Sequence, residues 1–338
     1  MLKPLFFLAT GALFVVVLLE GFFRLLPVST ATRTGYYINH NIVTYPAKHC
    51  FTTSTGWDLR SPQRHCANNY GFIADRDFSY NPDAIVIVGD SFVEAIMLPV
   101  REGLAARIES KLQGTLVYAM GGPGSSLLDY AERIQFARKN FGTKVFIIVI
   151  NRTDVRESIC GSGNIHAHCI DANGLHPKVE RLSSPSKLKQ IFREFSVAQY
   201  AFSQLRVNLS TFSPHFLKSS PIIKSSPDRP KPSITEAEVI VRTFFSRLPI
   251  GDEIKYFFVL DPDRSKHDNE KKKSEDIDLL RNLAKQFGVD VIDPLSDFMQ
   301  FKLLNNIALE VSPTDQHWNS EAIMIVAKLI ANRLNKFH

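Results

Sequence analysis

The sequence predicts an α/β fold in which a parallel β-sheet is covered by helices. Three apolar runs rich in β-branched residues, at 84–88, 115–119 and 144–150, have the length and composition of strands buried on both faces. Helices are expected between them, at about 101–113 and 126–139, and the first repeats leucine and isoleucine at helical spacing. Strand and helix therefore alternate, which favours right-handed crossovers and a parallel sheet.

The alternation resumes towards the carboxyl end of the chain. Helices are expected at about 236–248, 274–287 and 320–335, and strands at 256–260 and 289–292. The stretch 155–235 is less regular, with one helix expected at about 186–207. We interpret the Ser- and Pro-rich residues 210–232 as a mobile loop or lid, with a boundary between two domains as the alternative. The polar stretch 261–275 is expected to be a solvated loop.

Composition and motifs argue against a nucleic-acid-binding protein. The chain has 338 residues, of which 44% are hydrophobic and 22% charged, with a formal net charge of +6. These are the proportions of an ordinary globular protein. There is no zinc-finger spacing, RNA-binding signature or long basic arm, so we expect no nucleic-acid partner.

The amino terminus predicts a membrane helix. Residues 4–23 form an apolar run of about the ~20 residues that a membrane span needs, and Lys3 precedes it. A cleaved signal peptide is the alternative, although the best small-residue site lies downstream, near 29–31. The sequence therefore predicts a single-pass inner-membrane protein whose main domain lies on the periplasmic or extracellular side, or a secreted one if the segment is cleaved.

The four cysteines fall into two local pairs, Cys50 with Cys66 and Cys160 with Cys169, which predicts two disulfides in an exported chain. A zinc site is the alternative, because four histidines lie nearby: His49, His65, His166 and His168. The spacings match no common zinc motif, so we expect no metal. The predicted organisation is an anchor or signal at 1–29, a disulfide-strapped lead-in at 30–81, and one domain at 82–338 with an insertion at about 155–235.

Ser91 is the candidate nucleophile. It follows the first predicted strand in the sequence Gly89-Asp90-Ser91. Ligands of open α/β sheets bind outside the carboxyl ends of the strands, although an ordinary turn would have the same composition. A serine hydroxyl needs a base, and the base needs an orienting group. His317 is the candidate base, and Asp315 lies two positions before it in a short loop ahead of the last helix. Nucleophile, acid and base would then occur in the order Ser, Asp, His.

Three blocks of this sequence resemble the SGNH (GDSL) hydrolase superfamily: Gly89-Asp90-Ser91-Phe92, Gly121-Gly122-Pro123-Gly124 and Asp315-Gln316-His317-Trp318-Asn319. The resemblance covers 82–154 and, more loosely, 255–338. It implies a three-layer α/β/α sandwich with a flavodoxin-like parallel sheet and a serine that attacks an ester or transfers an acyl group. It also implies an oxyanion hole made by the amides of Ser91 and Gly124 and by an asparagine side chain after the third strand.

Two departures from the family pattern bear on this expectation. The family commonly has G-x-N-D after the third strand, where this chain reads Asn151-Arg152-Thr153-Asp154, so the third oxyanion donor is either Asn151 or Thr153. The amide of Asn151 is favoured on chemical grounds. The spacing Asp-x-His is also shorter than the common Asp-x-x-His, and it is similar to that of exported relatives acting on envelope polysaccharides, including alginate acetylation proteins.

The sequence thus predicts a serine esterase or O-acyltransferase without a cofactor. Its expected substrates are acyl groups, acetyl first among them, on an envelope polysaccharide or lipid, handled through an acyl-enzyme. The alternative is a non-catalytic envelope protein that keeps the fold and binds a glycan or an assembly partner.

Overall fold

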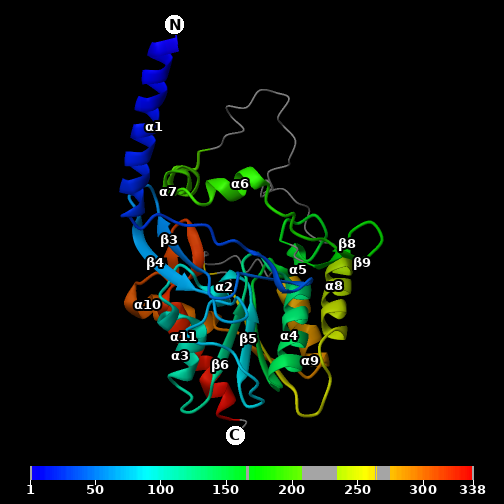
Figure 1. The fold of residues 1–338 in the computed structure, drawn as a ribbon. Coiled ribbons are helices and arrows are strands. Elements are labelled where there is room, and N and C mark those ends of the chain that lie inside the picture. Colours follow the sequence, from blue (N-terminus) through cyan, green and yellow to red (C-terminus); the bar gives the residue numbers. More distant parts are fainter. Residues whose placement is uncertain (1, 165–166, 208–233, 263, 265–274, 337–338) are drawn as a thin grey trace. The chain divides into compact units, whose positions relative to one another are not determined.

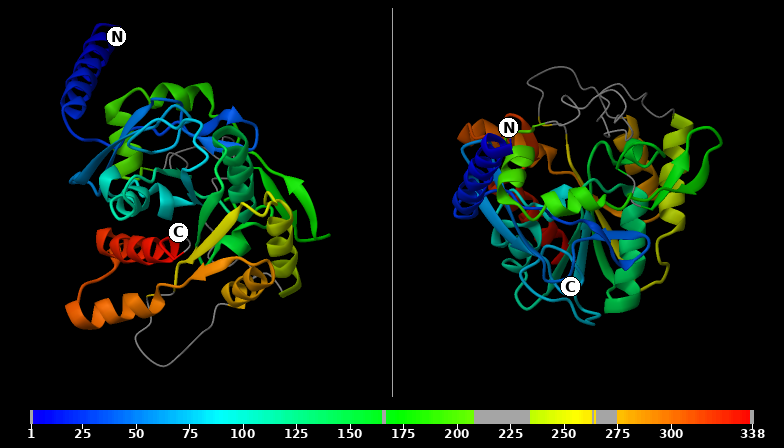
Figure 2. Two further views of the ribbon diagram at one scale, coloured as in Figure 1. Left: turned by 90° about the horizontal axis from the view of Figure 1, so that it is seen from below. Right: turned by 45° about the horizontal axis from the view of Figure 1, so that its top comes forward.

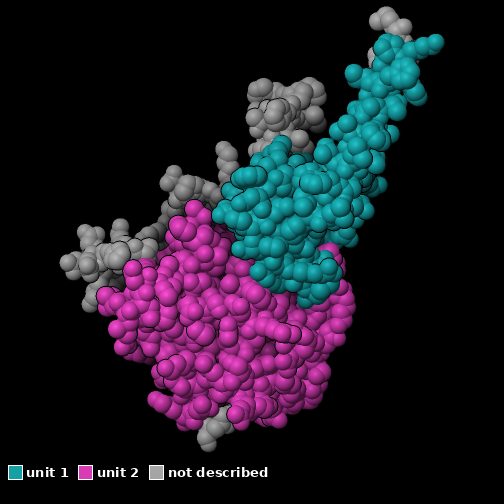
Figure 3. All heavy atoms as spheres, turned by 90° about the vertical axis from the view of Figure 1, so that its left-hand side faces the viewer, with its two compact units in different colours: residues 1–33, 50–66, 183–224 teal, residues 34–49, 67–182, 225–338 magenta. Residues whose placement is uncertain are grey.

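A computed structural model describes residues 2–164, 167–207, 234–262, 264 and 275–336 (Figure 1). The chain divides into two compact units (Figure 3). Unit 1 comprises residues 1–33, 50–66 and 183–224, and unit 2 comprises 34–49, 67–182 and 225–338. The lid predicted at 210–232 and most of the loop predicted at 261–275 lie outside the described residues.

Unit 2 is built on the parallel sheet that the sequence predicted. Its five strands run in the order β11-β10-β7-β5-β6, which is the flavodoxin order 2-1-3-4-5 once the strands are numbered along the chain. Their bounds are β5 Ile85–Gly89, β6 Val117–Gly121, β7 Val145–Ile150, β10 Lys255–Leu260 and β11 Asp290–Ile292.

Helices cover both faces of this sheet, and they give the three layers that were expected (Figures 1 and 2). Alternate residues of β5 enter two separate cores: Val86 and Val88 face one, and Ile85 and Ile87 face the other. The first core lies under α4 (Leu127–Phe141), α8 (Ile234–Ser246) and α9 (Glu275–Gln286). The second lies under α3 (Leu104–Glu109), α10 (Leu295–Asn305) and α11 (Ser320–Leu334).

Two predicted helices are wrong in extent. The helix expected at 101–113 is a 3-10 turn, Val100–Glu102, followed by α3, because Gly103 is extended and interrupts the helical backbone. The helix expected at 186–207 is broken into α6 (Lys187–Phe192), α7 (Ser196–Gln199) and a π-helical turn, Tyr200–Gln204. An extended Phe195 separates α6 from α7.

Several short elements lacked a recognisable pattern in the sequence. They comprise α2 (Ser91–Glu94), α5 (Asp154–Glu157), α10 and four hairpins: β1 Gly35–Asn39 with β2 Ile42–Thr44, β3 Cys50–Thr55 with β4 Arg60–Cys66, β8 His168–Asp171 with β9 His176–Val179, and β12 Glu310–Ser312 with β13 Asp315–Trp318. Strands of three to seven residues are too short for alternation to stand out in a sequence.

Both predicted disulfides are present. One joins Cys50 to Cys66 across the β3–β4 hairpin, and the other joins Cys160 to Cys169. The four sulfurs are therefore not thiolates that could bind zinc. His65, one of the histidines that suggested zinc, is buried beside the ring of Phe51.

Unit 1 begins with α1 (Leu2–Arg24), whose residues Phe6–Arg24 are long and apolar enough to cross a membrane or to act as a signal sequence. The carboxyl-terminal end of α1 is bound to α7. The Glu20 carboxylate accepts the backbone N–H groups of Ser196 and Val197 at 3.0 and 3.1 Å, and Phe23 lies 4.4 Å from Tyr200 between ring centroids. The apolar helix and the α6–α7 segment thus share one packed unit.

Candidate active site

Ser91 lies where β5 ends and the single turn of α2 begins. Asp90 caps this turn, because its Oδ1 accepts the N–H of Phe92 at 2.9 Å. The Oγ atom of Ser91 is 2.7 Å from Nε2 of His317. The tight strand-to-helix junction therefore presents the serine hydroxyl at the carboxyl edge of the sheet, within hydrogen-bonding distance of an imidazole.

His317 and Asp315 belong to β13, which pairs with β12 in a hairpin; the prediction that this segment is a loop is wrong. The correction explains how the two side chains meet, since residues two apart in a strand point to the same face. Nδ1 of His317 is 2.5 Å from Oδ1 of Asp315, which also accepts the backbone N–H of His317 at 3.1 Å. Ser91, His317 and Asp315 thus form one continuous hydrogen-bonded chain.

The surroundings favour a charged imidazole. Burial alone would lower the pKa of His317, but the hydrogen bond and charge of Asp315, together with the charges of Asp90 and Asp261, outweigh it and raise that pKa. The hydrogen bond from His317 in turn lowers the pKa of Asp315. The pair is therefore suited to hold a proton that arrives on the imidazole.

Asp261 and Arg264 anchor the hairpin, although the sequence placed them in a solvated loop. They are 2% and 9% exposed, and Arg264 Nη2 lies 3.2 Å from Asp261 Oδ1. Arg264 also donates to the carbonyl oxygens of Leu309 and Gln316, at 3.3 and 2.5 Å. Burial raises the pKa of Asp261 to about 6, against the charge of Arg264. Asp261 directly follows the buried strand β10, the same signal that singled out Ser91.

Asn151 is hydrogen-bonded to Asp90, the residue before the serine, and to Thr153. The Asn151 side chain is hydrogen-bonded to the Asp90 carboxyl, and its Oδ1 accepts the N–H of Thr153 at 3.3 Å. A carboxylate accepts hydrogen bonds, so the donor of the bond to Asp90 is the Nδ2 amide of Asn151. The buried Asp154 holds the loop that begins at Asn151. Its carboxylate accepts the N–H of Asn151 at 2.8 Å and the hydroxyl of Tyr130 at 2.9 Å.

Gly124 lies in the turn between β6 and α4. Its φ of +58° is in the left-handed region that favours glycine, and a Cβ atom there would lie 3.2 Å from Oδ1 of Asn164. β5, β6 and β7 are adjacent and parallel, so Ser91, Gly124 and Asn151 all follow strands that end at the same edge of the sheet.

Arg133, a residue of α4 that the sequence did not single out, supports the nucleophile loop from within. It is 1% exposed, and it donates to Gly89 O at 2.8 Å and to Ser125 Oγ at 2.5 Å. A Cβ atom on Gly122 would lie only 2.3 Å from Arg133 Nη2, so the glycine leaves room for the guanidinium. Burial raises the pKa of the neighbouring Glu94 to about 7.

The sheet has the flavodoxin order that the motif resemblance implied, and serine, histidine and aspartate are joined by hydrogen bonds at its carboxyl edge. No protein-family model matches the sequence, and no curated protein matched it either.

Solved structures similar to the chain include esterases and lipolytic proteins. They include a member of the lipolytic G-D-S-L family from Veillonella parvula, with 10% identity, coverage of 75% of this chain and 98% of that one, and a TM-score of 0.38. A carbohydrate acetylesterase family member from Sinorhizobium meliloti has 12% identity, coverage of 75% and 98%, and a TM-score of 0.36. A two-domain esterase active on acetylated mannans has 11% identity, coverage of 76% and 49%, and a TM-score of 0.38. At these identities, the roles of individual residues rest on the geometry of this chain.

Proposed function

We propose that the protein is a serine esterase of SGNH type. The observation that carries the proposal is the unbroken chain from Ser91 Oγ to His317 Nε2, 2.7 Å, and from His317 Nδ1 to Asp315 Oδ1, 2.5 Å. Ser91 attacks the acyl carbonyl while His317 accepts the hydroxyl proton on Nε2, and Asp315 orients the ring and stabilises the imidazolium. The imidazolium then returns the proton to the leaving alcohol, and a covalent acyl-enzyme remains on Ser91.

The oxyanion of the tetrahedral intermediate is assigned to the amides of Ser91 and Gly124 and to the side chain of Asn151. Asn151 is preferred to Thr153 because its Nδ2 has two N–H groups, and the bond to Asp90 uses only one of them. The bond from Thr153 N–H to Oδ1 holds the amide in this orientation. Each such donor contributes about 100- to 1000-fold in rate.

The substrate class is an acylated envelope polysaccharide or lipid, with acetyl as the first acyl group to test. Two features support a site outside the cytoplasm: the apolar segment Phe6–Arg24 of α1, which follows Lys3, and two disulfides, which persist in oxidising compartments. We place the protein in the inner membrane with unit 2 on the periplasmic side. Water would resolve the acyl-enzyme in a hydrolase, and a sugar hydroxyl would do so in a transferase.

Covalent labelling tests the proposal directly. A fluorophosphonate should label the protein on Ser91, and Ser91→Ala should lose both the label and the hydrolysis of p-nitrophenyl acetate while it unfolds at the same temperature. Ser110→Ala, which changes an exposed serine, serves as the matched control. A folded protein that takes no label would instead support a non-catalytic glycan-binding protein.

A further inference from the structure

Helix α6 exposes its apolar side chains. None of its six residues is buried, and its aliphatic residues Leu188 and Ile191 are 61% and 55% exposed. These two are three positions apart, so they lie on one face of the helix. An isolated helix of this length is marginal in water, and helices in proteins owe most of their stability to the packing of an apolar face. The exposed face of α6 therefore needs a partner to stabilise it.

The segment of α1 that could cross a membrane ends beside this part of unit 1. Figure 1 shows α7 against the carboxyl-terminal end of α1, and α6 running across the direction of α1. Glu20 accepts the first backbone N–H groups of α7, and the ring of Phe23 lies 4.4 Å from that of Tyr200. Arg33 and Glu194, which lies between α6 and α7, form an ion pair of 2.6 Å. Contacts within unit 1 thus hold α6 near the end of α1.

An exposed tryptophan lies at the same end of α1. Trp57, in the turn between β3 and β4, is 71% exposed, and its carbonyl oxygen accepts the hydroxyl of Tyr200 at 2.7 Å. Leu25, which follows α1 directly, is 85% exposed. Trp and Tyr are enriched where membrane helices leave the hydrocarbon. The exposed side chains around the end of α1 are therefore of the kind that lies at a membrane surface.

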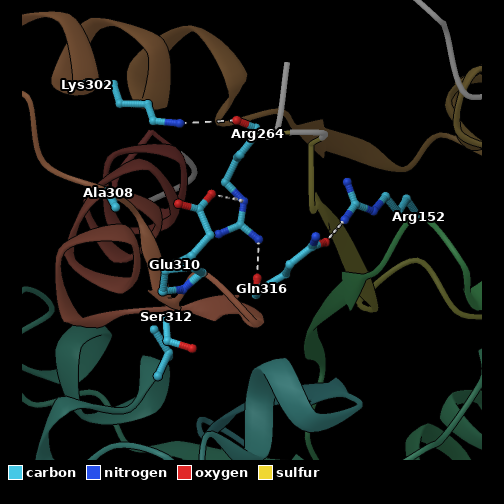
Figure 4. Close-up of a pocket in the computed structure, with 9 residues that line it drawn as sticks. Arg152, Arg264, Lys302, Ala308, Glu310, Ser312 and Gln316 are labelled. Carbon is cyan, nitrogen blue, oxygen red and sulfur yellow. Dashed lines mark hydrogen bonds and ion pairs between the residues drawn. The ribbon is translucent and has the colours of Figure 1, made fainter. Parts of the chain in front are cut away.

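α6 also carries positive charge. Lys187 and Lys189 are exposed, and among the residues that the structure describes no carboxylate oxygen lies within 4.0 Å of either ammonium group. The buried Arg264 of unit 2 differs, since its guanidinium donates to the carbonyl oxygen of Gln316 and lies 3.8 Å from Glu310 (Figure 4). Exposed lysines beside an apolar face are typical of helices that lie on anionic lipid surfaces.

We propose that α6 lies on the surface of the lipid bilayer that α1 crosses, with its apolar side chains among the acyl chains and its lysines on anionic headgroups. This rests on the proposed membrane location of α1 and goes beyond the proposed catalytic function. The apolar face of such a helix reaches about 5–10 Å into the boundary between headgroups and acyl chains. Bound to the membrane through both α1 and α6, unit 1 is held in one orientation, whereas α1 alone would leave it free to rotate.

Quenching of tryptophan fluorescence by brominated lipids tests the contact. The full chain is placed, one copy per disc, in nanodiscs of equal parts phosphatidylcholine and phosphatidylglycerol, with bromine on the acyl chains close to the headgroups. The reporter is Ile191→Trp in a Trp57→Phe background, because the remaining Trp318 is buried. The reporter should lose most of its emission relative to discs without bromine. Tyr80→Trp in the same background, at an exposed position of unit 2 outside the proposed surface, should keep its emission.

The role of the lysines is tested on the same reporter. Lys187→Glu combined with Lys189→Glu should restore the emission of Ile191→Trp, since each lysine near an anionic surface contributes about five-fold to binding. Lys139→Glu combined with Lys328→Glu, at exposed positions of α4 and α11, is the matched control and should leave the quenching unchanged. Equal quenching in the two double variants would contradict binding to anionic headgroups.

A tryptophan in α1 separates this proposal from the membrane location on which it rests. Phe14→Trp, in the same background, should be quenched by lipids brominated near the ends of the acyl chains if α1 crosses the bilayer. Quenching of Phe14→Trp without quenching of Ile191→Trp would overturn the proposal for α6 and keep the anchor, whereas no quenching of either would overturn both. Quenching of Tyr80→Trp as strong as that of Ile191→Trp would also overturn it. The esterase proposal is tested separately, by the labelling of Ser91.

Discussion

The indole Nε1 of Trp318 donates a 2.8 Å hydrogen bond to the buried carboxylate of Asp261. This bond joins the residue next to His317 to the carboxyl end of β10. Arg264 reinforces it, because its guanidinium binds the same carboxylate oxygen and two backbone carbonyls of the hairpin segment. The position of the candidate base thus depends on the buried ion pair of Asp261 and Arg264.

Replacing Asp261 by asparagine should lower both stability and activity. The new amide oxygen could still accept the Trp318 bond, but Arg264 would lose the buried charge closest to it, which typically costs about 3 kcal/mol. A shift of the hairpin by about 1 Å would lower kcat about 100-fold. Urea unfolding and p-nitrophenyl acetate kinetics measure the two effects. Asp83→Asn, which neutralises an exposed carboxylate, should change neither, and equal behaviour of the two variants would contradict the anchoring role.

The pH dependence of the rate should follow His317. Only the neutral imidazole can accept the serine proton, and the pKa of His317 is raised above its ordinary 6.5, so the rate should increase with pH through a midpoint above 6.5. Asp315→Asn removes the carboxylate that raises the pKa of His317. The midpoint should therefore move to lower pH, and kcat should drop about 10³- to 10⁴-fold. An unmoved midpoint in the asparagine variant would show that another group titrates.

The raised pKa of His317 should also make the stability of the protein depend on pH. The trend should be opposite to that of the rate: the rate increases with pH, whereas the stabilising contribution of His317 decreases. Because the folded-state pKa of His317 is raised, its stabilising contribution is complete below pH 6.5 and is lost as the pH rises through the folded value. The unfolding free energy of the native chain minus that of His317→Gln should thus decrease over this range. A difference that grows with pH would contradict the raised pKa.

Gly122→Ala should destabilise the protein at the turn between β6 and α4. The new methyl group would lie 2.3 Å from Arg133 Nη2, and this guanidinium is buried and bonded to Gly89 and Ser125, so it has little freedom to move. Overpacking of this kind costs about 1–3 kcal/mol. Gly251→Ala is the matched control, since its Cβ would have no neighbour closer than 3.6 Å. Thermal unfolding of the two variants should separate them clearly.

Removal of the Cys160–Cys169 disulfide should lower the stability of the protein without changing the hydrogen-bonded chain of Ser91, His317 and Asp315. Replacing both cysteines by serine should lower the free energy of unfolding by about 2–3 kcal/mol, because the unfolded chain regains the conformational entropy that the closed loop had removed. The double variant should keep fluorophosphonate labelling of Ser91. Loss of labelling in a folded double variant would mean that the disulfide positions the site.

The parallel sheet and the three residues of the hydrogen-bonded chain were predictable from the sequence. β5 and β7 are uninterrupted apolar runs, and Ser91, Asp315 and His317 lie in short motifs of polar and glycine residues. Local patterns therefore identified the three residues that the structure joins by hydrogen bonds.

The supports of the site were not predictable in the same way. Arg264 lies in a stretch whose charged composition is typical of an exposed loop, but it is buried and donates to the backbone oxygens of Leu309 and Gln316. In the sequence, Arg133 occupies an ordinary position of a helix, and its burial becomes apparent only in the folded structure. α10 was missed because it exposes Leu303 and Leu304, so it has no single apolar stripe. These features depend on partners far away in the sequence.

Ser91 and His317 are 226 residues apart along the chain. The ribosome therefore completes the sheet strand that presents the hydroxyl long before it adds the imidazole. The hydrogen bond between Ser91 and His317 can therefore form only after the β12–β13 hairpin has been synthesised.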